Sequence, residues 1–315
     1  NEWVRGICEK PRIKCAECPN RAFIPVGEAE IRAHLTGSDT NGKPFIMGIY
    51  PMLLDETCWF LALDLDKEEW EKDAAALREV CKKRLVPAAL ERSRSGNGGH
   101  LWIFFADPLP AVLARKLGTG LLTAAMRERP DLGFASYDRL FPNQDTLPRG
   151  GFGNLIALPL QGIPRKQGNS VFLDEALQPI EEQWSFLASL PRMSSSSVEQ
   201  VVAGMERNGT LLGVRGVPEE TFALEPWKAP PSRQVNPPVQ GPLPERIEFI
   251  LSDQIYLPRE LLSPSLRNQL LRIAAFQNPE FYKAQAMRLP TYETPRIIAC
   301  AEEFEEHIAL PRGCL

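Results

Sequence analysis

The sequence lacks the features that would mark a membrane protein or a protein coated in positive charge. No apolar run approaches the roughly 20 residues of a membrane helix, and no signal-peptide pattern opens the chain. Its 36 Lys and Arg are outnumbered by 40 Asp and Glu, so the net charge is -4. This charge balance excludes a surface that is basic throughout, but a local basic groove would still bind nucleic acid. We expect a cytoplasmic protein.

Histidine is scarce, and cysteine is unevenly distributed. The chain has three histidines, so histidine chemistry must use His34, His100 or His307. The seven cysteines are an odd number, and three of them, Cys8, Cys15 and Cys18, cluster near the start. In a reducing compartment such a cluster favours a zinc site, with His34 as the nearest candidate for the fourth ligand. The alternative is three reduced thiols in an irregular segment.

The interleaved basic residues of the cysteine segment indicate a possible partner. Lys10, Arg12, Lys14 and Arg21 would give this segment a positive face for nucleic acid.

Hydrophobic periodicity over residues 58–174 predicts a mixed α+β domain. The apolar spacing in the segment that starts at Trp70 is typical of a helix, and the run that ends at Asp66 is typical of a buried strand. The order is strand, helix, strand, strand, helix, strand, with one extra strand, which is the split βαβ pattern of RRM-like sheets. The expected strands are 58–66, 86–93, 100–105, 154–161 and 169–174, and the expected helices are 67–85, 114–126 and 182–191.

Composition divides the 315 residues into four expected parts. Residues 1–50 form an N-terminal α/β, zinc-bearing module that packs on the catalytic domain of residues 51–192. Residues 193–244 are rich in Pro and Ser and are expected to be a linker. Residues 245–315 are expected to be a mostly helical extension. The chain begins with Asn and ends in LPRGCL, so we expect it to be a fragment of a longer protein.

Two aspartates end the strand CWFLALDLD at residues 58–66. Asp64 and Asp66 are two positions apart, so both side chains point to the same face. Adjacent carboxylates repel each other, and a divalent cation such as Mg²⁺ or Mn²⁺ would remove that repulsion. The alternative is a solvated strand end with acidic residues that begin the next helix.

A glycine-rich loop joins the second and third expected strands in ERSRSGNGGHLWIFF. Ser95 and Gly96 lie in a tight turn whose backbone amides could face an anion, and His100 is a polar residue at the start of an apolar strand. Arg92 and Arg94 add positive charge for nucleic acid. A phosphate site fits these residue types, whereas the alternative is an ordinary hairpin with an incidental histidine.

The long segment 136–161 supplies candidates for a third carboxylate. A site that holds two metal ions needs one, and Asp138 is the first candidate and Asp145 the second. Downstream, Arg165 and Lys166 could reach triphosphate oxygens. A loop of this length inside a compact domain is more often functional than not. By contrast, the aromatic residues Trp59 and Trp184 are expected to pack in the core.

Together these motifs resemble the archaeo-eukaryotic primase superfamily, the primase-polymerases. DLD at a strand end, SGNGGH before a strand and a third Asp before a closing hairpin carry the resemblance over about residues 50–190. In four segments the sequence is similar to the primase domain of TOTE-type conflict systems: SRSGNGGHLWIFF, SYDRLFPNQD, GGFGNLIALPLQ and GNSVFLD. The tail from Gln277 onward resembles the segment that joins such a primase to its helicase, which would lie beyond residue 315.

The resemblance implies roles for individual residues. Asp64, Asp66 and Asp138 would hold two Mg²⁺ or Mn²⁺ ions, and His100, with Ser95 and Gly96 in the same loop, would contact the phosphates of the incoming nucleotide. Gln161 and Lys166 would also contact the nucleotide. The activity implied is template-dependent nucleotidyl transfer on single-stranded DNA or RNA.

Two other functions fit some of the same residues. A different metal enzyme, such as a nuclease or a DxD glycosyltransferase, would also use Asp64 and Asp66. A non-catalytic nucleic-acid adaptor for a helicase would use the cysteine segment and the sheet without chemistry.

Overall fold

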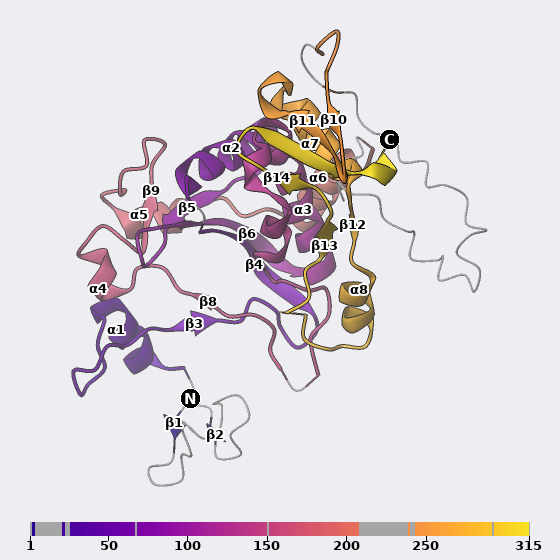
Figure 1. Cartoon of the computed structure of the whole chain (residues 1–315). Coiled ribbons are helices and arrows are strands. Elements are labelled where there is room, and N and C mark those ends of the chain that lie inside the picture. The colour runs from indigo at the N-terminus through magenta and orange to yellow at the C-terminus, as the bar shows by residue number, and fades with distance from the viewer. Residues whose placement is uncertain are drawn as a thin grey trace.

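A five-stranded antiparallel sheet forms the centre of the molecule. The computed structural model describes residues 2–3, 21–22, 26–66, 68–149, 151–207, 239, 243–291 and 293–314. The sheet has the order β7-β4-β6-β5-β9, and β4 and β6 make its longest pairing (Figure 1). Its strands are β4 (Thr57–Leu65), β5 (Ala89–Arg92), β6 (Gly99–Pro110), β7 (Leu140–Phe141) and β9 (Val171–Leu173).

Three helices cover one face of this sheet. They are α2 (Trp70–Lys83), α3 (Ala111–Glu128) and α6 (Ser195–Arg207). Their apolar sides and the alternate β4 residues Leu61, Leu63 and Leu65 form the main hydrophobic core. Helix α6 lies where we expected a linker, so that part of the expectation is wrong. Its residues Val198 and Val202 repeat at helical spacing and are buried, which fixes the helix on the core.

A thinner layer lies on the opposite face of the sheet. It contains α1 (Glu28–Thr36), α4 (Gly162–Arg165), α5 (Gln183–Ser189) and the short ribbon of β3 (Gly48–Ile49) and β8 (Ile156–Ala157). Ile156 packs with Phe60, Trp102 and Phe172 in a second apolar cluster. Figure 1 shows α1 and α4 beside each other below the sheet.

Helices α1 and α4 approach closely because residue 162 is glycine. A Cβ atom at Gly162 would lie 2.3 Å from the backbone carbon of Thr36 and 2.5 Å from the carbonyl oxygen of Leu35. The strand expected over 154–161 is shorter than predicted, since only residues 156–157 pair. It pairs with β3 outside the central sheet, and β7, which was not predicted, takes a place in that sheet instead. The other predicted central elements are found within a few residues at each end.

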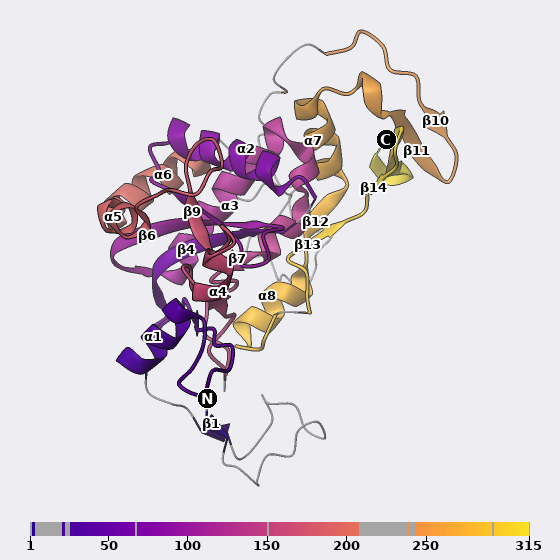
Figure 2. The same cartoon turned by 90° about the vertical axis from the view of Figure 1, so that its left-hand side faces the viewer.

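The C-terminal part is mixed, so our expectation of a mostly helical extension is wrong. It contains a four-stranded antiparallel sheet of order β10-β11-β15-β14 beside α7, and α8 lies farther away, beyond β12 and β13 (Figure 2). The segment around Phe249, which looks helical in composition, leads instead into a hairpin. Residues of β11 alternate between buried and half-buried, which is the two-residue period of a strand.

The remaining elements complete the described chain. The C-terminal ones are β10 (Ile250–Leu251), β11 (Gln254–Pro258), α7 (Pro264–Ile273), β12 (Ala275–Gln277), α8 (Pro279–Ala286), β13 (Ile297–Ala299), β14 (Glu302–Glu303) and β15 (His307–Pro311). The 3-10 turns are η2 (Pro130–Leu132), η3 (Phe134–Asp138), η5 (Arg259–Leu261) and η6 (Arg312–Cys314). At the other end, β1 (Glu2–Trp3) pairs with β2 (Arg21–Ala22).

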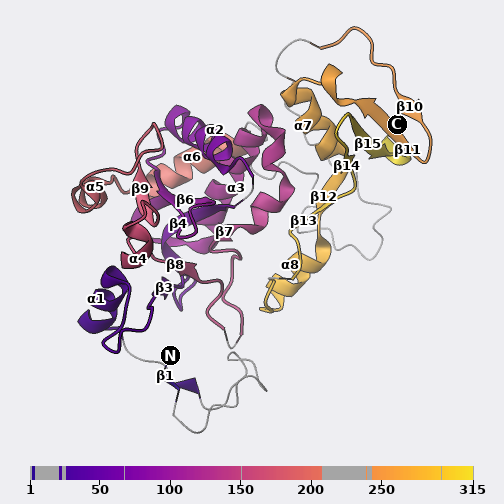
Figure 3. The same ribbon diagram turned by 60° about the vertical axis from the view of Figure 1, so that its left-hand side comes forward.

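The C-terminal part packs directly on the central domain. Helix α7 lies against α3, and α8 lies near the loop that follows β7 (Figure 3). Side chains join the two parts: Gln285 of α8 hydrogen-bonds Asp145, and the backbone N–H of Arg296 donates to Asp138. Among the described helices, none is long and apolar enough to cross a membrane.

Candidate active site

The ends of four strands meet at one edge of the central sheet. Strands β4 and β5 end there, and β6 and β9 begin there. The pairing register puts Asp64 of β4 opposite His100 of β6, and His100 opposite Glu91 of β5. All three side chains lie on the face away from α2 and α3, because they alternate with residues of the main core. The sheet therefore carries a row of polar side chains on one face.

Asp64 and Asp66 share one cationic partner, Arg139. Its Nη1 lies 3.5 Å from Oδ2 of Asp64 and in direct contact with Oδ2 of Asp66. The backbone also joins these strands, since the Asp64 N–H donates to the Arg139 carbonyl at 3.0 Å. The two carboxylates are thus close enough to be neutralised by a single cation, as the sequence predicted for residues two apart on a strand.

Asp64 lies in an environment that disfavours its charge. Burial raises the pKa of Asp64 above its usual value, and the Asp66 carboxylate adds to the increase. His100 and Arg139 act in the opposite direction but do not cancel the effect. An ionised Asp64 therefore costs folding free energy, which a bound cation would recover.

His100 is held between Asp64 and a buried carboxylate, Glu91. Its Nδ1–H donates to Oε2 of Glu91 at 2.9 Å, and the same oxygen accepts Nε1–H of Trp102 at 2.8 Å. Nε2 of His100 then faces Oδ1 of Asp64 at 3.7 Å. Glu91 is only 2% exposed. Burial alone would lower the pKa of His100, but Glu91, Asp64 and Asp66 together raise it.

Glu91→Gln is expected to lower the pKa of His100 in the metal-free protein. The amide keeps the shape of the side chain but removes the charge that favours the imidazolium. The stability that the pair contributes is present below the unfolded pKa of histidine and is lost as pH rises through the raised folded value. Titration of the His100 ring by NMR measures the shift, with the exposed Glu71→Gln as control. An unchanged pKa of His100 in Glu91→Gln would mean that Asp64 and Asp66 alone raise it.

The glycine-rich loop packs on the end of β4. A Cβ atom at Gly98 would lie 2.6 Å from the Leu65 carbonyl oxygen, so only glycine permits this approach. Gly96 has a φ of +82°, in the left-handed region that favours glycine. The hydroxyl of Ser95 accepts the N–H of Asn97 at 3.3 Å, which closes the turn. The loop thus lies directly beside Asp66, as a phosphate site next to the carboxylates would require.

Asp138 directly precedes Arg139, which contacts the carboxylate pair, but its own carboxylate contacts the C-terminal part. Its Oδ1 accepts the Arg296 N–H at 2.8 Å. It lines a pocket of about 210 Å³ with Asn143, Phe281 and Thr291. Burial raises the pKa of Asp138, although Arg296 opposes the increase. Among the described residues, no group of three or more His, Cys, Asp or Glu side chains is arranged to hold a metal ion.

Asp145, the second candidate for the third carboxylate, forms a buried ion pair. Its Oδ1 accepts Nη1–H of Arg115 at 2.6 Å, and its Oδ2 accepts Nε2–H of Gln285 at 2.9 Å. Burial would raise the pKa of Asp145, but the Arg115 and Arg296 charges lower it below its usual value. These contacts give Asp145 a structural role between the central domain and α8.

The residues predicted to bind nucleotide or nucleic acid lie in different surroundings. Gln161 is buried and donates from Nε2 to the Phe45 carbonyl at 2.9 Å, while its Oε1 is buried without a partner among the described residues. Arg92 donates to the carbonyls of Gly168 and Leu177 and so holds the neighbouring loop. Arg94 and Lys166 are exposed on the surface.

Of the predicted zinc ligands, His34 alone lies in the part of the chain that the structure describes. Cys8, Cys15 and Cys18 lie outside the described part of the chain, so the zinc site stays a prediction. His34 is buried and uses both ring nitrogens: Nε2 donates to the Pro159 carbonyl at 2.9 Å, and Nδ1 accepts the Met47 N–H at 3.1 Å. A zinc ion on His34 would have to replace one of these hydrogen bonds.

Two residues of the site, Glu91 and Arg139, were not identified from the sequence. Glu91 is a charged residue inside the apolar strand segment AALER, and such a residue in a buried strand signals a specific partner. Arg139 directly follows the predicted Asp138, but no local pattern indicates that it contacts Asp64 and Asp66. That contact depends on the pairing of β7 with β4.

Comparison with known proteins agrees with the motifs read from the sequence. No curated protein matches the chain. The family model described as the archaeo-eukaryotic primase domain of the TOTE conflict system matches residues 1–201, which is well over half of the chain. The resemblance read from DLD, SGNGGH and SYDRLFPNQD is therefore confirmed, and the chain belongs to the TOTE conflict-system family of archaeo-eukaryotic primase domains.

Proposed function

We propose that this chain is a template-dependent primase-polymerase that transfers nucleotides from (d)NTPs to a 3′-hydroxyl on a single-stranded template. Membership of the family supports a primase or nucleotidyltransferase type of function in a conflict system, with binding of nucleic acid and nucleoside triphosphates. The observation that carries the proposal is the convergence of Asp64, Asp66 and His100 at one sheet edge, beside the glycine-rich loop.

The catalytic domain in this proposal is an RRM-like sheet within residues 51–192. The chain order β4-α2-β5-β6-α3-β7 and the spatial order β7-β4-β6-β5 support this assignment. In a split βαβ fold the first and third strands lie together at the centre, as β4 and β6 do here. Carboxylates on these central strands are held rigidly, which suits catalysis by positioning and charge.

Divalent cations fit the Asp64 and Asp66 pair. Arg139 already lies as a cation against both carboxylates, and carboxylate oxygens suit Mg²⁺ and Mn²⁺. Domains of this family generally use divalent metals. When bound, such ions would neutralise the triphosphate and lower the pKa of the 3′-hydroxyl. Arg139 would then be free to contact a phosphate oxygen.

His100 is assigned to the phosphates of the incoming nucleotide. Glu91 keeps its ring fixed and favours its charged form, so Nε2–H is available as a charged donor. Gly98 and Gly99 let the loop backbone lie close to the strand ends, and Ser95 lies in the same loop. Gln161 and Lys166 remain proposed nucleotide contacts, with weaker support from their surroundings.

The third carboxylate in the proposal is Asp138. Its burial and raised pKa are consistent with a group whose charge needs a cation. It would have to exchange its hydrogen bond from Arg296 for a metal, whereas Asp145 would have to abandon the buried charge of Arg115. The second exchange is more costly. A zinc ion on the cysteine segment and a helicase beyond residue 315 also remain part of the proposal.

The decisive experiment measures nucleotide incorporation on primed and unprimed single-stranded DNA, with Mg²⁺ and with Mn²⁺, for wild type and Asp66→Asn. Wild type is expected to extend the primer, and the variant is expected to lose extension while its fold and template affinity are kept. Products on the unprimed template would identify a primase. DNA and RNA templates and ribo- and deoxynucleotides are compared in parallel.

Other results would favour the other functions. Template binding without incorporation, unchanged by Asp66→Asn, would identify an adaptor. Metal-dependent cleavage of the template, lost in Asp66→Asn, would identify a nuclease.

A further inference from the structure

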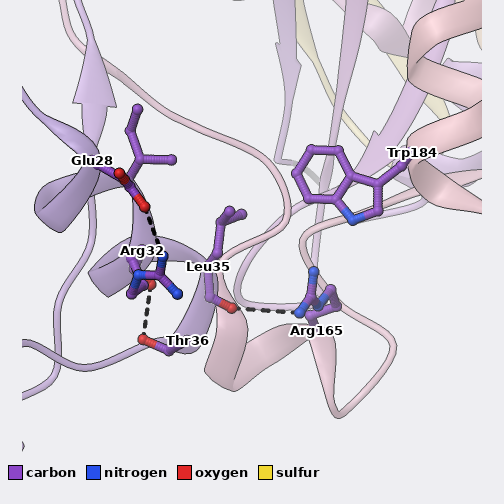
Figure 4. A pocket seen from close by; sticks show the side chains of 7 residues that line it. Glu28, Arg32, Leu35, Thr36, Arg165 and Trp184 are labelled. Atoms are coloured by element: carbon purple, nitrogen blue, oxygen red, sulfur yellow. Dashed lines mark hydrogen bonds and ion pairs between the residues drawn. The ribbon is translucent and has the colours of Figure 1, made fainter.

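A second hollow on the surface lies outside the candidate active site. It has a volume of about 460 Å³ and lies between α1, α4 and α5. Figure 4 shows Trp184 of α5 opposite Arg165 of α4, with α1 on the other side. Ile31 and Leu35 give the wall on the α1 side an apolar character. The sequence offered Arg165 as a contact to triphosphate oxygens, but in the structure it lines this hollow, and no other lining residue has a role proposed above.

Trp184 is exposed, contrary to our expectation that it packs in the core. Its exposed fraction is 52%, although other residues of α5, such as Phe186 and Leu187, pack on the second apolar cluster. Helix α5 is short, and its apolar residues cannot all face the sheet. A large flat ring left at the rim of a hollow is suited to stacking on another flat group.

Arg165 supplies a positive charge that no described carboxylate neutralises. Its Nη2–H donates only a long hydrogen bond, 3.4 Å, to the Leu35 carbonyl. The other arginine of the hollow, Arg32, is paired with Glu28 at 2.7 Å, so Glu28 is already engaged. The hollow therefore combines an open aromatic face with one available guanidinium, which can bind a phosphate through two N–H groups.

The hollow lies along the polar row of the catalytic face. Phe172 of β9 pairs with Glu91, and its backbone exchanges hydrogen bonds with the side chain of Gln183, the residue before Trp184. Three strand spacings separate β4 from β9, which is about 15 Å across the sheet. A few nucleotides of a single strand span this distance.

We infer that this hollow is a binding site for single-stranded nucleic acid, in which one base stacks on Trp184 and the adjoining phosphate binds Arg165. The inference rests on the proposed function, because a strand would reach the hollow from the carboxylates. Single-stranded nucleic acid is bound elsewhere by this same pair of groups, an aromatic face for the base and a cation for the backbone. The site holds the template away from the reacting end and is not specific for sequence, since every base can stack.

The test measures binding without catalysis. A fluorescein-labelled oligothymidylate long enough to reach from Asp64 to Trp184 is titrated with the full chain in EDTA, and fluorescence anisotropy gives Kd. Trp184→Ala is expected to raise Kd about 5-fold to 100-fold, and Trp184→Phe much less, since phenylalanine still stacks. Arg165→Gln is expected to reduce the slope of log Kd against log salt by about 0.7, the value for one phosphate on a single strand.

Trp59→Ala is the matched control. Trp59 is 45% exposed, contrary to our expectation that it packs in the core, and it lies near the start of β4, at the other end of the strand from Asp64, so its loss is expected to leave Kd unchanged. An equal loss of affinity in Trp184→Ala and Trp59→Ala would overturn the inference, and so would unchanged affinity in both Trp184→Ala and Arg165→Gln.

A second measurement separates this inference from the proposed function. In primer extension, Trp184→Ala is expected to raise KM for template and to leave kcat at saturating template unchanged. Normal extension with no change in template KM or Kd would overturn the binding site alone. Absence of extension in the wild type would overturn the proposed function, while the EDTA titration would still decide the binding site.

Discussion

Asp64→Asn is expected to abolish nucleotide incorporation and, in the metal-free protein, to raise the melting temperature. Activity is expected to fall about 100-fold or more, because the neutral amide cannot hold the cation that balances the triphosphate. Stability is expected to rise because burial and Asp66 disfavour the ionised carboxylate of Asp64. In a chain of 315 residues a gain of about 1 kcal/mol corresponds to about 1–2 °C, because the entropy of unfolding scales with chain length.

The gain in melting temperature of Asp64→Asn is expected to be larger at neutral pH than in acid. Burial raises the pKa of Asp64 in the folded state, so its ionised form destabilises the fold at neutral pH. The difference in Tm between variant and wild type is therefore largest at neutral pH and shrinks as pH falls through the raised pKa, where Asp64 takes up a proton.

Differential scanning fluorimetry in EDTA, and then with added Mn²⁺, measures both effects of Asp64→Asn. Manganese is expected to raise the Tm of the wild type and to have less effect on the variant. Asp107→Asn serves as the control, since Asp107 is exposed and lies well along β6 from His100. A lower Tm in metal-free Asp64→Asn would contradict the prediction.

Asp145→Ala is expected to lower the free energy of unfolding by about 3–5 kcal/mol. The substitution leaves the guanidinium of Arg115 buried without its carboxylate, and such a charge is costly. Arg115 is 1% exposed, and its Nε and Nη2 already have no hydrogen-bond partner among the described residues. Burial, together with the charge of Arg296, lowers the pKa of Arg115 to about 10.

Urea denaturation at neutral and at acidic pH measures this loss. The pKa of Asp145 is lowered in the fold, because the Arg115 charge outweighs burial. The stability that it contributes is present above the unfolded pKa of aspartate and is lost as pH falls through the folded value. The wild type and Asp145→Ala are therefore expected to converge in acid.

The double variant Arg115→Met with Asp145→Ala is the matched control for the buried pair. It removes the uncompensated charge and is expected to recover most of the stability that Asp145→Ala loses. Equal stabilities of wild type and Asp145→Ala at neutral pH would contradict the prediction.

Local patterns were sufficient to predict the centre of the fold. The two-residue period of β4 and the helical period of α2 follow from burial on one face, so their positions and the shared face of Asp64 and Asp66 could be read directly. The hairpin of β5 and β6, whose loop carries the glycines, places His100 opposite Glu91, and the antiparallel pairing of β4 with β6 places it opposite Asp64. These features depend on neighbours in sequence or on one antiparallel pairing.

Features that depend on distant segments could not be read in this way. The contact of Arg139 with the two aspartates requires the return of the chain as β7, and the contact of Asp138 with Arg296 joins residues 158 positions apart. The segment of β10 was mistaken for helix because its composition favours helix, whereas the partner strand decides its structure. Trp184 was assigned to the core because amphipathic spacing does not say how deeply a short helix is buried.

The two candidate carboxylates Asp138 and Asp145 both hydrogen-bond residues beyond the end of the family match at residue 201. The stretch that matches the family model is thus shorter than the part of the chain that surrounds Asp138 and Asp145. A protein cut at residue 207 would lose Gln285 and Arg296, open the surroundings of Arg115 to water and leave Asp138 without its backbone donor. The boundary for an expressed catalytic fragment therefore lies after β13, not at the end of the matching sequence.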